Sequence, residues 1–226
     1  MTKSLSVLLV FSFLFPVIGF SEQKTKKSSP FSLDQLQEKY RSSESVSADF
    51  VQEVYQAALA KTKTSKGHLK LSKPNFLRWE IDEPESSVMV SNGNKFSYFT
   101  PDAKGKGKGQ VIERKAKELQ KQALFRILSG ASNLNKEFEI LKNSQSSEQD
   151  KAKILTSLEL KPFKPIGDVT TVSLKISANY LIQEIYLVNT AGNKTRITLQ
   201  NQELGDKLPT ALFDFHPPQG TEIVKE

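Results

Sequence analysis

The amino-acid sequence predicts a mostly β protein whose antiparallel strands form one curved sheet. The clearest observation is the segment from Lys66 to Pro101, where apolar and polar residues alternate in four short runs. Turn-forming residues, including Pro74, Pro84 and the pair Asn92-Gly93, separate these runs. The turns are too short for the crossover that parallel strands need, so neighbouring strands must be antiparallel.

The first residues predict a signal peptide, residues 1–21. Lys3 precedes an apolar run from Leu5 to Ile18 that is too short to span a membrane, and small residues follow it. The alternative, a retained anchor helix, is disfavoured by this length and by Pro16. An exported chain is therefore expected.

The rest of the chain shows no linker that would mark a domain boundary. Residues 22–30 are polar and rich in Lys and Ser, and we expect them to form a flexible segment. Residues 31–226 are predicted to form a single domain.

A short helix is predicted at the start of this domain. Ser32 can cap it, and Gln35 completes a capping box. Leu33, Leu36 and Tyr40 lie at helical spacing and form a narrow apolar stripe. Because the stripe is narrow, the helix must pack on another surface to be stable.

A second helix is predicted from Lys115 to Gly130, where glycine is a natural stop. Its apolar face contains five residues: Leu119, Ala123, Leu124, Ile127 and Leu128. This helix interrupts an otherwise β sequence, so we expect it to cover a sheet face or the mouth of a barrel.

Strands are predicted before and after these elements. The first runs from Val46 to Tyr55, and Ala57–Ser65 is predicted to be a polar connection into the central segment. Later strands are predicted at Gln110–Arg114, Phe138–Lys142, Ile154–Leu160, Thr171–Ile176, Ile182–Asn189 and Thr195–Gln200. Asp102–Gly109, rich in Gly and Lys, and Asn143–Asp150 are predicted to be loops. About eleven antiparallel strands in succession curl into a barrel or a strongly bent half-barrel.

Composition restricts the function. The chain has no cysteine and only two histidines, which makes thiol chemistry, zinc sites and histidine-based catalysis improbable. No phosphate-binding glycine loop, zinc-protease motif or nucleophile elbow is present. The sequence thus predicts no enzyme activity, no metal and no cofactor.

The net charge of +7 is spread along the chain. It fits a solvated surface, or weak attraction to anionic lipid or an acidic partner, and it does not predict nucleic-acid binding. Fourteen Phe, five Tyr and one Trp supply inward-facing apolar side chains. Either a packed core or a ligand cavity accounts for them.

A family resemblance bears on this choice. The run SKPNFLRWEIDEP, followed by VMVSNGNKFSYFTP, closely resembles the outer-membrane lipoprotein carrier family LolA. Three further segments agree in place: Ser47–Gln52, Ala123–Gly130 and Phe213–Gly220. The resemblance extends from about Phe31 to Val224.

The resemblance implies an unclosed antiparallel barrel of eleven strands with a helical lid that encloses an apolar cavity. It also implies a monomeric carrier, not an enzyme, that is located in the periplasm. Such a carrier takes acylated lipoproteins from an inner-membrane ABC transporter and delivers them to an outer-membrane receptor. Two alternatives remain open: a periplasmic module of the same fold that senses lipid or lipoprotein, and an enzyme built on this fold.

The resemblance also implies site residues. Nine are expected to line the acyl-binding cavity: Tyr40, Phe50, Leu69, Leu77, Trp79, Phe96, Tyr98, Leu124 and Ile127. An arginine of the family, which hydrogen-bonds to the lid backbone, corresponds to Lys73. Lysine keeps the charge but loses the planar fork of donors, so Lys73 is expected to be a weaker latch.

Overall fold

The computed structural model describes residues 31–102, 109–146 and 155–225. The predicted signal peptide, the predicted flexible segment 22–30 and parts of the predicted loops 102–109 and 143–150 lie outside the described residues. The chain from Phe31 to Glu226 is one compact unit, and only this unit is described below.

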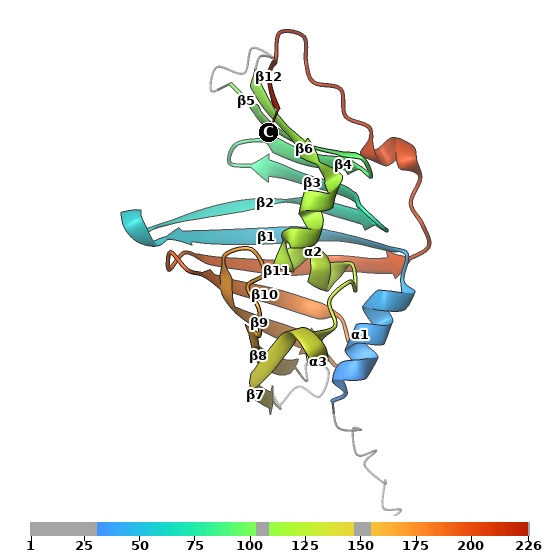
Figure 1. Ribbon diagram of the computed structural model, residues 1–226, viewed down its shortest axis with the longest axis vertical. Helices are drawn as coiled ribbons and strands as arrows, with labels where there is room; N and C mark the ends of the chain where they lie inside the picture. Colours follow the sequence, from blue (N-terminus) through green and yellow to red (C-terminus); the bar gives the residue numbers. More distant parts are fainter. Residues whose placement is uncertain (1–30, 103–108, 147–154, 226) are drawn as a thin grey trace, which may run out of the picture. The chain divides into compact units, whose positions relative to one another are not determined.

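One sheet of twelve strands makes up most of the unit (Figure 1), in the order β12-β6-β5-β4-β3-β2-β1-β11-β10-β9-β8-β7. The strands are β1 (Ser45–Gln56), β2 (Lys61–Ser72), β3 (Phe76–Glu83), β4 (Ser87–Asn92), β5 (Lys95–Pro101), β6 (Gly109–Lys115), β7 (Phe138–Ser146), β8 (Leu155–Pro162), β9 (Val169–Ser177), β10 (Ile182–Asn189), β11 (Lys194–Gly205) and β12 (Glu222–Lys225). All neighbours are antiparallel except β12 and β6. Because β7 and β12 lie at opposite ends of the order, the sheet is unclosed, which confirms the predicted fold class.

Three α-helices and three 3-10 turns accompany the described strands: α1 (Leu33–Ser42), η1 (Ala57–Leu59), η2 (Ala116–Lys121), α2 (Ala123–Leu128), α3 (Leu134–Glu137) and η3 (Thr210–Phe213). The predicted cap of the first helix is confirmed, since the Ser32 hydroxyl accepts the Gln35 N–H at 3.3 Å. Figure 1 shows η2 and α2 in front of the central strands, and α1 beside them. The continuous segment of η2 and α2, Ala116–Leu128, is called the lid segment below.

The predicted continuous helix from Lys115 to Gly130 is wrong. Strand β6 continues to Lys115, and Gln122 is extended (φ −93°, ψ 121°), which separates the 3-10 turn from α2. The Gln122 N–H closes the 3-10 turn on the Leu119 carbonyl. This break lets both Leu119 and Phe125 turn inward, which a single helical stripe would not allow.

Two predicted loops are also wrong in part. Residues Lys61–Ser65 belong to β2, which pairs with β1 along its whole length, from Ser45 opposite Ser72 to Gln56 opposite Lys61. Likewise, β7 continues to Ser146. The outer half of β2 is polar on both sides and exposed from Lys61 to Thr64, so no alternation marks it as a strand. The twelfth strand, β12, was not predicted and lies after Phe213–Gly220.

Candidate binding cavity

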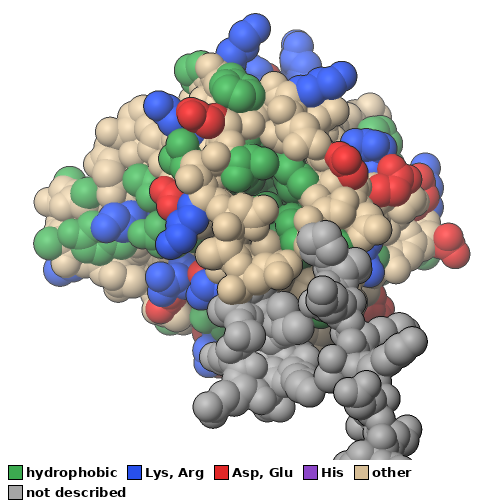
Figure 2. Space-filling view, turned by 90° about the horizontal axis from the view of Figure 1, so that it is seen from below, with side chains coloured by type: hydrophobic (Ala, Val, Ile, Leu, Met, Phe, Trp, Pro, Cys, Tyr) green, Lys and Arg blue, Asp and Glu red, His purple; other side chains and the backbone are tan. Residues whose placement is uncertain are grey.

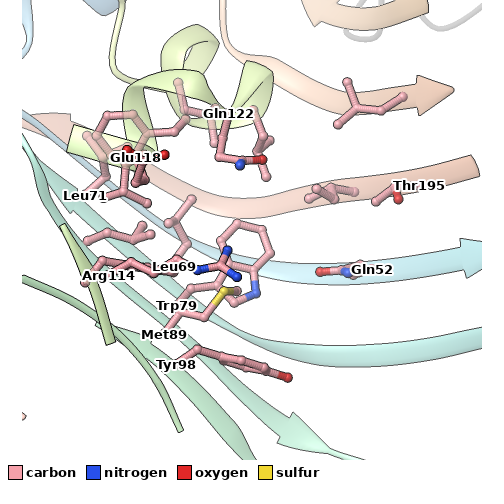
Figure 3. Close-up of a pocket in the computed structure, with 18 of the residues that line it drawn as sticks. Gln52, Leu69, Leu71, Trp79, Met89, Tyr98, Arg114, Glu118, Gln122 and Thr195 are labelled. Atoms are coloured by element: carbon pink, nitrogen blue, oxygen red, sulfur yellow. The ribbon is translucent and has the colours of Figure 1, made fainter. Parts of the chain in front are cut away.

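An apolar cavity of about 420 Å³ lies between the sheet and the lid segment (Figure 3). This volume is within the range of roughly 300–1,000 Å³ that is usual for small-molecule sites. The lining residues are Gln52, Leu69, Leu71, Leu77, Trp79, Met89, Phe96, Tyr98, Ile112, Arg114, Glu118, Leu119, Gln122, Leu124, Phe125, Leu128, Leu187, Thr195 and Ile197.

The strand register builds one wall of this cavity. Directly paired residues form a row across β2 to β6: Leu69, Trp79, Met89, Tyr98 and Ile112. Each of them lines the cavity. Directly opposite residues of an antiparallel sheet lie on one face, so the row follows from pairing and the two-residue period.

A second row lies beside the first, two residues along each strand. It runs through Leu71, Leu77, Ser91, Phe96 and Arg114, of which only Ser91 does not line the cavity. The hydroxyl of Ser91 instead donates a hydrogen bond to the Asn75 carbonyl at 2.5 Å. The two rows together make a mainly apolar surface that faces the lid segment.

The lid segment supplies the opposite wall through Leu119, Leu124, Phe125 and Leu128, with Gln122 between them. In Figure 3, Glu118 lies toward one end of the cavity and Gln52 and Thr195 toward the other, while the side chain of Arg114 extends toward Trp79. Most of the lining side chains are hydrocarbon and offer no hydrogen bond, while Gln122, Arg114, the Trp79 indole and the Tyr98 hydroxyl add a few polar atoms to the wall. Such a space suits a hydrocarbon chain.

Trp79 is central to the sheet wall. It is 3% exposed, and its ring packs against Phe50 with a centroid distance of 4.2 Å. Its indole Nε1 has no hydrogen-bond partner among the described residues. The contact with Phe50 restricts the position of the indole.

The structure brings six of the nine predicted site residues to the cavity wall: Leu69, Leu77, Trp79, Phe96, Tyr98 and Leu124. Phe50 is outside the lining and contacts Trp79. Tyr40 and Ile127 line a separate and much smaller pocket, together with α1 and α3 residues. Several lining residues were missed, among them Met89 and Ile112. The pairing register would have found both, because they lie directly across from Trp79 and Tyr98.

Tyr40 joins α1 to the far half of the sheet. It is 2% exposed; its hydroxyl accepts the Ile182 N–H at 2.9 Å and donates to Gln202 Oε1 at 3.2 Å. Burial raises the pKa of Tyr40 to about 12, against the opposing effect of the Ile182 hydrogen bond. The side chain is thus a neutral structural contact at physiological pH.

Comparison with known proteins identifies the family. Residues 41–216 match the family model described as "Outer membrane lipoprotein carrier protein LolA". The chain belongs to the LolA family. A protein from Pseudomonas fluorescens named outer-membrane lipoprotein carrier protein is 24% identical over 96% of this chain and 99% of its own. A protein of the same name from Dechloromonas aromatica is 29% identical over 86% of this chain and 88% of its own.

Solved structures show a more distant similarity. A LolA superfamily protein from Nitrosomonas europaea aligns at a TM-score of 0.43 and 14% identity, covering 81% of this chain and 96% of that one. A putative outer membrane lipoprotein-sorting protein domain from Vibrio parahaemolyticus aligns at 0.39 and 12% identity, covering 80% and 94%. The family assignment rests on the sequence matches.

In this LolA-family chain, Lys73 contacts the end of α1. Its ammonium group donates hydrogen bonds to the carbonyl oxygens of Tyr40 (3.1 Å) and Arg41 (2.5 Å). These carbonyls belong to the last turn of the helix, where no intrahelical N–H is available. Burial lowers the pKa of Lys73, and Arg41 adds to this while Glu44 opposes it.

Gly130 lies against the same turn. It has φ +69°, and a Cβ at this position would lie 2.6 Å from the Arg41 nitrogen and the Tyr40 carbonyl group. The end of α1 therefore contacts both Lys73, which follows β2, and Gly130, which lies two residues past the lid segment.

Two further observations concern the described residues. None of their helices has the length and apolar character needed to cross a membrane. Among them, no group of three His, Asp or Glu side chains is arranged to hold a metal ion.

His68 lies between Asp49 (2.6 Å) and Asp82 (3.3 Å) on the exposed side of the sheet, where Asn201 also bonds to Asp49.

Proposed function

We propose that this LolA-family protein is a periplasmic carrier that acts by binding and without catalysis. It binds the acyl chains of lipoproteins released by an inner-membrane ABC transporter and delivers them to an outer-membrane receptor. The observation that carries the proposal is the apolar cavity between the strand rows and the lid segment. The names of the related carriers agree with it.

The energetics of a hydrocarbon guest fit such a cavity. Each buried methylene contributes about 0.8 kcal/mol, so one long acyl chain gains on the order of 10 kcal/mol. The guest must displace contacts that the lid segment makes with the sheet, and this lowers its net affinity. A receptor can then take the cargo, because the emptied carrier recovers those contacts.

The site residues follow from this function. Leu69, Leu77, Trp79, Phe96, Tyr98 and Leu124 contact the acyl chain, and Phe50 supports Trp79. Tyr40 and Ile127 contribute where α1 and α2 meet, beside the cavity. Lys73 holds α1 in the closed arrangement through the Tyr40 and Arg41 carbonyls.

Leu77→Glu tests the proposal. Leu77 is 7% exposed and lines the cavity, so a carboxylate here places a charge against the acyl chain. A purified acylated lipoprotein in inner-membrane vesicles should be released into solution by the wild type and not by the variant. Displacement of an apolar dye by fatty acid should likewise be lost.

Leu141→Glu is the matched control, since Leu141 is 49% exposed on β7 and lies outside the cavity. It adds the same charge and should leave release unchanged. Normal release by folded Leu77→Glu would exclude the cavity as the cargo site. Dye binding by the wild type without any release of lipoprotein would favour a lipid-sensing module.

A further inference from the structure

The hairpin of β1 and β2 extends past its neighbour β3. Strand β2 pairs with β3 only from Lys66 onward, so Lys61–Ser65 lie beyond that strand. In Figure 1 the hairpin ends at the left, away from α1. The tip is the 3-10 turn η1, and Leu59 at its end is 62% exposed, between the exposed Ala58 and Ala60.

This tip has a defined conformation. The Asn193 side chain accepts the Ala57 N–H at 2.9 Å, and the Ala60 N–H closes the turn on the Ala57 carbonyl. The turn of β10 and β11 is adjacent, since a Cβ on Gly192 would meet that of Ala57 at 3.5 Å. The exposed leucine is therefore presented by a supported turn.

Basic side chains surround the tip. Lys61 and Lys194 are exposed and form no ion pair within the described residues; Lys194 lies over the Tyr55 ring at 5.6 Å. Three acidic residues of this end are already neutralised by ion pairs: Glu53 with Arg196, Glu83 with Lys66, and Glu85 with Lys63. The uncompensated charge beside Leu59 is positive. Figure 2 shows hydrophobic and basic side chains together at its left edge, where the hairpin ends.

We propose that this tip, with Leu59 at its end and Lys61 and Lys194 beside it, docks transiently on an anionic phospholipid surface. An exposed apolar side chain flanked by lysines enters the boundary between headgroups and acyl chains, while the lysines attract the anionic headgroups. One leucine and two lysines bind less tightly than a myristoyl chain, whose attachment is itself reversible. Such docking is weak enough for the protein to leave again.

The hairpin also connects this surface to the cavity. Gln52 on β1 and Leu69 on β2 line the cavity, and the same two strands end at the tip. Docking would hold the cavity at a defined distance from the bilayer. This contact requires no cargo, transporter or receptor, so its test is independent of the carrier function.

The experiment uses the absence of cysteine from the chain, which makes Leu59→Cys a unique thiol. The variant is labelled with an environment-sensitive fluorophore and mixed with vesicles of phosphatidylglycerol and phosphatidylcholine, or of phosphatidylcholine alone. We expect a blue shift and brighter emission with the anionic vesicles, weaker at high salt. Adding Lys61→Gln and Lys194→Gln should lower the vesicle affinity roughly thirtyfold, from the contribution of two lysines near an anionic leaflet.

Labelled Leu141→Cys is the control, because Leu141 is an exposed leucine on the edge strand β7. It should show no shift. In vesicle flotation without any label, Leu59→Ser should bind roughly tenfold more weakly than the wild type. The proposal is overturned if the emission at position 59 does not shift with anionic vesicles, or if the emission at position 141 shifts equally. It is also overturned if the emission of the fluorophore at position 59 changes with protein concentration in the absence of lipid. That result would make the tip a contact between copies of the protein.

Discussion

The ammonium group of Lys73 donates a hydrogen bond to the carbonyl oxygen of Tyr40 at 3.1 Å, joining the end of β2 to the last turn of α1. The side chain of Tyr40 reaches the opposite half of the sheet, where its hydroxyl bonds to Ile182 and Gln202. A single residue of α1 thus contacts both halves of the sheet. The position of α1 depends on these two attachments more than on its narrow apolar stripe.

Lys73→Met should loosen the first attachment. It removes both donated hydrogen bonds from the α1 carbonyls, and we expect a loss of about 1–2 kcal/mol in the free energy of unfolding. Amide hydrogen exchange should accelerate in α1 before it does so in the central strands. Lys73→Arg, which keeps charge and donors, should retain slow exchange; unchanged α1 exchange in Lys73→Met would show that no such latch exists.

Tyr40→Phe tests the second attachment. The variant removes the hydroxyl that the Ile182 N–H and the Gln202 Oε1 atom bond to, and it should cost about 1–3 kcal/mol at neutral pH. Denaturant unfolding followed by fluorescence measures this loss. A cost near zero would mean that water replaces the hydroxyl freely.

The stability lost in Tyr40→Phe should depend on pH. The pKa of Tyr40 is raised to about 12 from an ordinary value of 10.0, so the fold favours the protonated phenol. The contribution of the Tyr40 hydroxyl to the free energy of unfolding is fully present below pH 10.0 and is lost as the pH rises through about 12. The stability difference between wild type and Tyr40→Phe should therefore narrow over this window. A constant difference would contradict the assigned cause.

Gly130→Ala should be severely destabilising. The residue has φ +69°, and the new methyl group would meet the α1 backbone at 2.6 Å. Left-handed backbone and steric conflict together should cost about 2–4 kcal/mol. Gly205→Ala is the control, because a Cβ there meets nothing within 4 Å. Equal melting temperatures for the two variants would refute the close contact between Gly130 and α1.

Trp79 offers a direct report of cavity occupancy. It is the only tryptophan of the chain and lines the cavity. A fatty acid brominated in mid-chain should quench its fluorescence, whereas the unbrominated acid should not. The Leu77→Glu variant should show little quenching at the same concentrations. Strong quenching that persists in this variant would place the ligand elsewhere near Trp79.

Most of the strands could be predicted from alternation, because one side of each faces the interior. Leu77 and Trp79 are examples, and Leu174 and Ile176 on β9 are likewise buried. Alternation of apolar and polar residues gave no signal where burial did not alternate along a strand. Residues Lys61–Thr64 are exposed on both sides of a paired strand, and their pattern could not be distinguished from that of a loop.

The lid segment shows a different limit. Its apolar residues suggested one helical face, but the extended Gln122 splits it into a 3-10 turn and a short helix. Both pieces bury apolar side chains against the sheet wall. That arrangement depends on the shape of a surface formed by residues far away in the chain. The local spacing of apolar residues therefore could not predict it.

Local chemistry was enough to predict a β-rich chain with antiparallel neighbours, because alternation and turn residues act over a few positions. Short sequence motifs were also enough to indicate the family. The residues of the cavity wall and the attachment of α1 could be found only from the fold. Four successive strand pairings place Leu69 and Ile112 in the same wall, and Lys73 bonds to the Tyr40 carbonyl across the space between two elements. Register and distance in three dimensions set these contacts, and both emerge only when the whole sheet assembles.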